Sequence, residues 1–151
     1  MEQKNLKLHS MQSFQIKTYS GQSDFTGQYF FILNKGMNSG KPLSSPCPNC
    51  FILLAPSAAD KDFFYWLCFG LWQSKSFHPF LRGSVIPFIV IDELKQCIKE
   101  GAAKANENLP EFKRSLQLLK AIEQKEKQFH QNLLMLKDAK RAIFYRFMRR
   151  R

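Results

Sequence analysis

Residues 57–72, SAADKDFFYWLCFGLW, decide the fold that the sequence predicts. Ser57 and Asp60 have the spacing of a helix N-cap followed by an acid in the first turn, so we expect a helix over residues 58–75. Its centre, residues 63–72, is apolar on every side, which is typical of a helix buried in a protein core. A membrane span needs roughly 20 apolar residues, about twice this run. The segment therefore predicts a buried aromatic helix.

Short apolar runs before and after this helix predict strands. Residues 13–19 alternate between apolar and polar side chains, as a half-exposed strand does. Residues 29–33, 51–55 and 85–91 are short runs with β-branched or aromatic side chains, flanked by Gly, Pro, Asn and Ser. Pro87 lacks an amide hydrogen, so we expect the last run at an edge or a bulge.

The C-terminal part has helical spacing throughout. Residues 94, 98, 101 and 105 share one helical face, and Asn108 with Glu111 then has capping-box spacing for a second helix. From residue 112 the apolar side chains follow 3,4 spacing over close to 40 residues, on the order of 60 Å of helix. The members of this stripe are Leu119, Ile122, Phe129, Leu133, Leu136, Ile143 and Phe147, interrupted by Glu126 and Lys140. Such a helix overhangs a small domain, so we expect it to pair with the preceding helix or with a second subunit through residues 109–148.

These elements predict an α+β fold. A sheet of three or four strands packs on one buried aromatic helix, and a C-terminal helical pair with a long basic amphipathic helix follows. Of the 21 Phe, Tyr and Trp residues, 16 lie before residue 91. We therefore divide the chain into an aromatic-rich module, residues 1–91, and a helical hairpin or extension, residues 92–151, which together form one compact unit.

The high positive net charge is the most unusual property of the composition. Lys and Arg number 23 against 12 Asp and Glu, a formal net charge of +11 over 151 residues. The last fifteen residues alone carry a local charge of +6, with Asp138 as their only acid. A soluble protein this basic usually binds nucleic acid, an anionic membrane surface or an acidic protein.

The N-terminal residues 1–17 lack the apolar run of a secretory signal, and no window is long and apolar enough to span a membrane. We therefore expect a cytoplasmic protein whose four cysteines are thiols. No cofactor is expected.

The loop of residues 34–42, NKGMNSGKP, is the strongest candidate binding loop in the first half. Its glycines allow left-handed backbone, and Lys35, Asn38 and Lys41 offer groups that bind anions. It does not fit a P-loop, because the spacing between its glycines is one residue short and Pro42 replaces the hydroxyl that holds magnesium. The loop is either a solvated turn or a contact for an anion or nucleic acid.

Two further segments have motif-like spacing. Cys47 and Cys50 could both reach one zinc ion, but no second ligand pair exists, so the rival interpretations are a redox dithiol or small residues in a Pro-rich turn. Asp92, Glu93 and Lys95 follow an apolar run, as in metal-dependent nucleases of the restriction-enzyme type. The upstream acid would have to be Asp60 or Asp24; acids at a helix start explain the segment more simply. We predict no metal ligands and no catalytic residues.

Residues 137–151 mix arginines with aromatic side chains. Guanidinium groups bind phosphates and aromatic rings stack on unpaired bases. A solvated helix end, an anionic membrane and an acidic protein remain alternatives. The predicted nucleic-acid-binding residues are Lys35, Asn38, Lys41, Lys137, Lys140, Arg141, Arg146, Arg149, Arg150 and Arg151.

The strings NKGMNSGKP, PCPNCF, FFYWLCFGLW and GSVIPFI resemble a small protein family associated with phages and conjugative elements of gut bacteria. The resemblance covers roughly residues 30–90 and leaves out the long helix. That family has no assigned activity, so no site residues follow from it. It implies an accessory protein of a mobile element, in contact with DNA, RNA or a host defence protein.

The sequence thus predicts a non-enzymatic, basic accessory protein of a mobile genetic element that binds DNA or RNA through backbone phosphates, with weak sequence specificity. The alternative is a protein-interaction module or inhibitor that binds a host or phage protein through its long helix and aromatic surface. A metal-dependent nuclease is the third hypothesis.

Overall fold

The computed structural model describes residues 14–21 and 25–150. Its four strands form one antiparallel sheet in the order β1-β4-β2-β3. They are β1 (Gln15–Thr18), β2 (Gln28–Leu33), β3 (Pro42–Leu43) and β4 (Cys50–Ala55). The helices are α1 (Ala58–Gln73), α2 (Ile91–Glu107) and α3 (Leu109–Met148), and a short 3-10 turn lies at His78–Phe80. The predicted α+β class with a long C-terminal helix is confirmed.

The sheet carries apolar side chains on both faces. On the face toward the helices, Phe30 lies opposite Leu53 and Ile32 lies opposite Phe51, and all four side chains are buried. On the other face, Phe31 and Ile52 form the centre of a second, smaller core. The half-buried members of that second core are Tyr19, Phe25, Tyr29, Leu43, Cys47 and Leu54. Because successive side chains of a strand point to opposite faces, strands β2 and β4 supply both cores.

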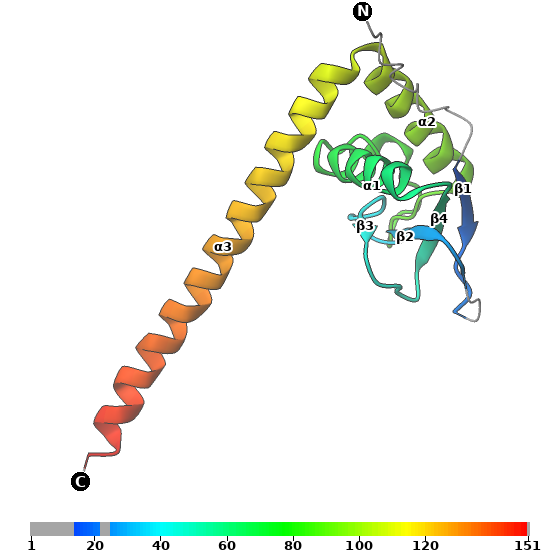
Figure 1. Cartoon of the computed structure of the whole chain (residues 1–151). Coiled ribbons are helices and arrows are strands. Elements are labelled where there is room, and N and C mark those ends of the chain that lie inside the picture. The colour runs from blue at the N-terminus through cyan, green and yellow to red at the C-terminus, as the bar shows by residue number, and fades with distance from the viewer. Residues whose placement is uncertain (1–13, 22–24, 151) are drawn as a thin grey trace, which may run out of the picture. The chain divides into compact units, whose positions relative to one another are not determined.

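Helix α1 matches the buried aromatic helix that the sequence predicts. Ser57 is its N-cap: the Ser57 hydroxyl accepts a hydrogen bond from the Asp60 amide at 3.1 Å and donates one to the Asp60 carboxylate at 2.6 Å. None of residues 63–72 is exposed. Helices α1 and α2 pack together over one side of the sheet (Figure 1). At their contact, a β-carbon on Gly101 would lie 3.2 Å from Leu71, so the missing side chain allows close packing.

The strand predictions over residues 29–33 and 51–55 are confirmed, as is the described part of residues 13–19. The predicted strand over residues 85–91 is wrong. Arg82 and Phe88 exchange two backbone hydrogen bonds of 2.9 Å, and the chain between them forms a loop with Gly83 at a φ of +94°. Pro87 has no amide to donate, so the run cannot continue a ladder. The fourth strand is instead β3, which has two residues and begins at Pro42.

Helix α3 begins as predicted. The Asn108 side-chain amide donates to the Glu111 carboxylate at 2.6 Å, and the Glu111 amide donates to the Asn108 side-chain oxygen at 3.4 Å. The chain forms two compact units, Met1–Phe112 and Lys113–Arg151, so the sequence-based boundary after residue 91 falls within the first unit. Among the residues that the structure describes, no helix combines the length and apolarity needed to cross a bilayer.

Candidate nucleic-acid interface

The loop of residues 34–42 leads from β2 into β3, and its backbone amides donate hydrogen bonds within the loop and to neighbouring segments. Gly36 and Gly40 have φ values of +91° and +96°, as the sequence predicts for a left-handed backbone. The amide of Gly36 donates to the Pro87 carbonyl at 2.7 Å, and the amide of Gly40 donates to the Leu33 carbonyl at 2.8 Å. The amides of Ser39 and Lys41 also donate within the loop. These four amides are therefore not aimed at an anion, and the loop can bind one only through side chains.

The three predicted side chains of this loop differ in their surroundings. Lys35 and Asn38 are exposed, so both can reach a phosphate. Lys41 is half-buried, and its ammonium nitrogen lies 4.9 Å from the centroid of the Trp72 ring. An ammonium group over an indole face is stabilised by the ring electrons, which competes with phosphate binding. Lys35 and Asn38 are therefore the better placed of the three.

The loop of residues 82–88 lies beside these residues, and sequence reasoning missed it. The backbone of Phe88 pairs with that of Lys35 and also with that of Arg82. Arg82 adds a third cation next to the binding loop, although its guanidinium donates to the Glu93 carboxylate at 2.6 Å. The signal that could have found this loop is Gly83 followed by Pro87, which is typical of a turn.

The last turns of α3 carry the second predicted patch. All its described cations are exposed: four lie on α3 and two directly follow its last residue, Met148. They are Lys137, Lys140, Arg141, Arg146, Arg149 and Arg150. The guanidinium carbon of Arg149 lies 4.6 Å from the centroid of the Tyr145 ring, and Arg141 lies 3.8 Å from the Asp138 carboxylate. Arg151 lies outside the described residues. The loop and the helix end belong to different units, so we treat them as two patches.

The acids of the nuclease hypothesis have structural roles. Asp92 and Glu93 lie in the first turn of α2, where a carboxylate interacts favourably with the helix dipole. Glu93 binds Arg82, and Asp60 belongs to the N-cap of α1. Asp24 lies outside the described residues. Within residues 14–21 and 25–150, no three His, Cys, Asp or Glu side chains lie close enough together to hold one metal ion.

The C-x-x-C segment forms a tight turn before β4. The Cys50 thiol donates to the Cys47 carbonyl at 3.0 Å, and the Cys47 amide lies 3.5 Å from the Cys50 sulfur. Burial raises the pKa of the Cys50 thiol above its ordinary value, and this effect outweighs the lowering by the hydrogen bond with the Cys47 backbone. Metal binding and disulfide exchange both need a thiolate, so this environment disfavours either chemistry. All four cysteines are free.

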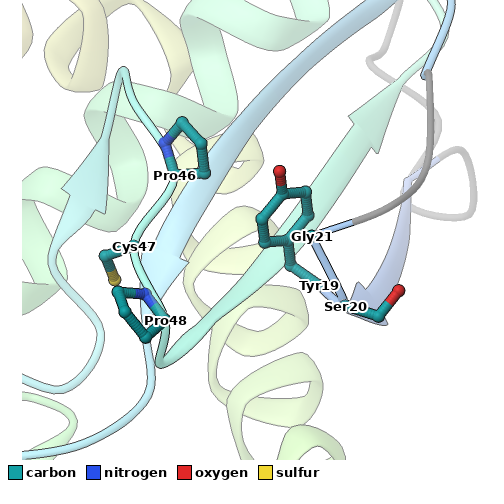
Figure 2. A pocket seen from close by; sticks show the side chains of 6 residues that line it. All are labelled: Tyr19, Ser20, Gly21, Pro46, Cys47 and Pro48. Carbon is teal, nitrogen blue, oxygen red and sulfur yellow. The ribbon is translucent and has the colours of Figure 1, made fainter.

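An open hollow of about 470 Å³ lies next to this turn and was not predicted. Figure 2 shows Tyr19 on one side of the hollow, with Pro46, Cys47 and Pro48 on the other. A second hollow of about 360 Å³ shares Tyr19 and Pro46 and is lined by Phe25, Tyr29 and Phe31. The alternation of residues 13–19, which places Tyr19 on the face away from the helices, is the signal for this aromatic surface.

Together, the fold and these surfaces define a small basic α+β protein with a long, cationic C-terminal helix. The chain belongs to a family of unknown function (DUF6943), whose model matches residues 16–146. The match covers β2, β3 and β4, all of β1 except Gln15, and most of α3. It therefore extends well beyond the segment in which the sequence alone showed a resemblance. No curated protein matches the sequence.

Proposed function

We propose that the protein binds nucleic acid through backbone phosphates, without catalysis, and that the end of α3 supplies most of the contacts. The observation that carries the proposal is the exposure of every described cation between residues 137 and 150, where Asp138 is the only acid. Each cation that neutralises a phosphate releases counterions, so such a surface binds any sequence. The earlier resemblance supports an accessory protein of a mobile element as the setting.

Exposed aromatic rings near the arginines favour unpaired bases as part of the target. Phe144 is 65% and Tyr145 is 56% exposed, and Arg149 already stacks on Tyr145. Arginine and aromatic side chains both stack on bases, and each stacked base adds on the order of 1–3 kcal/mol. We therefore expect single-stranded DNA or RNA to bind at least as well as a duplex of the same length.

The test is the salt dependence of binding by the full chain and by a chain that ends at Tyr145, measured by fluorescence anisotropy with labelled oligonucleotides. The shortened chain lacks Arg146, Arg149, Arg150 and Arg151. For duplex DNA, this loss should reduce the slope of log affinity against log salt by about 3.6 between roughly 50 and 200 mM, if each arginine contacts one phosphate. A matched control replaces four cations from the first half of α3 by glutamine: Lys113, Arg114, Lys125 and Lys127. We expect a smaller change for the control. Unchanged affinity of the truncated chain at low salt overturns the proposal.

The second candidate is a protein-interaction module or inhibitor. It is favoured by the large apolar side chains that α3 exposes, such as Ile122 at 64% and Phe129 at 67%. Exposed apolar surfaces of this extent mark interaction sites. A protein partner should stay bound after nuclease treatment and at moderate salt, whereas partners held by nucleic acid are lost, so a pull-down with and without nuclease separates the two functions.

A further inference from the structure

Helix α3 has the heptad pattern of a coiled coil over residues 115–147. The apolar stripe recurs at alternating intervals of three and four residues, which is the spacing of a coiled-coil seam. On the opposite side of the helix, Gln117, Gln124, Gln131 and Asp138 recur every seven residues. The stripe side chains from residue 122 onward are 60–73% exposed: Ile122, Phe129, Leu133, Leu136, Ile143 and Phe147. The helix therefore has one apolar face built for another helix.

The two charged residues that interrupt the stripe disfavour a parallel pair. Glu126 and Lys140 occupy equivalent positions of the heptad, two heptads apart. In a parallel pair of identical helices each seam residue faces its own counterpart. Glu126 would then face Glu126 and Lys140 would face Lys140, which places like charges together in the seam.

An antiparallel pair in which Gln131 of one copy lies level with Gln131 of the other no longer places these like charges opposite each other. In that register Phe129 of one copy faces Leu133 of the other, and Leu119 faces Ile143. Lys140 faces Ile122, where its aliphatic stem can cover the apolar side chain.

The same register matches acids with lysines. Lys140 of one copy lies one residue away from the position directly opposite Glu123 of the other, an offset of about 1.5 Å along the helix axis. Lys137 of one copy has the same one-residue offset from the position opposite Glu126 of the other. Because the pair is symmetric, both contacts occur twice, and opposite charges across a seam set the orientation of a coiled coil.

We propose that residues 115–147 of α3 form an antiparallel two-stranded coiled coil with a second copy of this chain. The four inward-facing positions of each heptad give about 20 residues per copy, at the lower end of the roughly 20–30 per side of a standard interface. The overlap is about 50 Å long. This pairing places the arginine-rich ends of the two copies at opposite ends of the coiled coil. The proposed dimer does not depend on the proposed function.

Light scattering of the nuclease-treated full chain at physiological salt tests the proposal, with the wild type expected at twice the mass of one chain. Glu123→Lys with Glu126→Lys should give monomers, since all four ion pairs become lysine pairs. Lys137→Glu with Lys140→Glu should also give monomers. The four changes together should restore the dimer, and so should mixing the two double variants.

A matched control separates pairing from total charge. Gln117→Lys, Gln124→Lys, Gln128→Lys and Gln131→Lys add the same four charges on the outer side of the helix, and the dimer should persist. Circular dichroism checks that every variant keeps its helix. A monomeric wild type overturns the proposal, as does a dimer that survives both double variants or a fourfold variant that stays monomeric.

Discussion

The ring of Phe77 lies against the α-carbon of Gly40, in the space that a β-carbon on residue 40 would occupy. Phe77 is 1% exposed and belongs to the core between the sheet and the helices. Gly40 lies near the end of the binding loop and has a φ of +96°, a backbone conformation that residues with a β-carbon rarely adopt. This contact anchors the loop of residues 34–42 to the protein core.

Gly40→Ala should therefore destabilise the protein by on the order of 3 kcal/mol, because the substitution combines backbone strain with an overpacked core. Gly36→Ala is the matched control: Gly36 has a φ of +91° but no neighbouring atom within 4 Å of an added β-carbon. It should cost only about 1–2 kcal/mol. Urea unfolding followed by tryptophan fluorescence measures both, and equal losses would show that the Phe77 contact contributes nothing.

The sequence was sufficient to predict the elements whose signals are local. The Ser57 cap, the apolar centre of α1 and the Asn108 cap each depend on residues within a few positions of one another. Strand β3 could not be predicted, because two residues beginning with Pro42 carry no alternation and pair only where β2 presents its edge. The loop of residues 82–88 was missed for a related reason, since Val85 and Ile86 look like strand residues although their apolar side chains are exposed.

The candidate site was predicted only as a list of charges. That Lys41 lies over Trp72 depends on how α1 packs against the loop, which no local spacing encodes. The use of the loop amides in internal hydrogen bonds, including the bond from Gly36 to Pro87, likewise follows from tertiary packing. The cations at the end of α3 were easier to place, because a continuous helix exposes them wherever it lies.

The 82–88 loop gives a second stability prediction. Val85 is 89% and Ile86 is 63% exposed, so Val85→Ser with Ile86→Ser should change the free energy of unfolding by no more than about 0.5 kcal/mol. Ile89 is only 2% exposed, and Ile89→Ala should cost about 2–5 kcal/mol. Thermal unfolding of the three proteins measures the contrast. A large loss from the double substitution would mean that residues 85 and 86 are buried after all.

Two buried thiols predict a loss of stability in alkali. Burial raises the pKa of Cys97 from 9.0 to about 11, with the charge of Glu100 adding to the rise. Burial also raises the pKa of Cys68, well beyond that of Cys97. The native state holds both protons more tightly than the unfolded state, so their contribution is complete below pH 9 and is lost as the pH rises toward 11 and above.

The expected loss between pH 8 and pH 10.5 is on the order of 2 kcal/mol for each thiol. Cys97→Ala removes one titrating group, so this variant should show a shallower decline over that range than the wild type, whatever its stability at pH 8. Urea unfolding at both pH values measures the difference. Parallel declines would show that Cys97 ionises in the native state as freely as in the unfolded chain.

The unequal surroundings of Lys35 and Lys41 predict unequal roles in binding. Lys35 is exposed, so Lys35→Gln should reduce the salt slope for duplex DNA by about 0.9, the effect of one phosphate contact. The ammonium of Lys41 lies over the Trp72 ring, so Lys41→Gln should change the slope less and should instead lower the stability by about 0.5–1 kcal/mol through the lost cation–π contact. Anisotropy titrations at several salt concentrations, with urea unfolding of the same proteins, measure both quantities. If Lys41→Gln flattens the slope as much as Lys35→Gln and leaves the stability unchanged, the ammonium group leaves the indole face to bind phosphate, and the loop presents two equivalent cations.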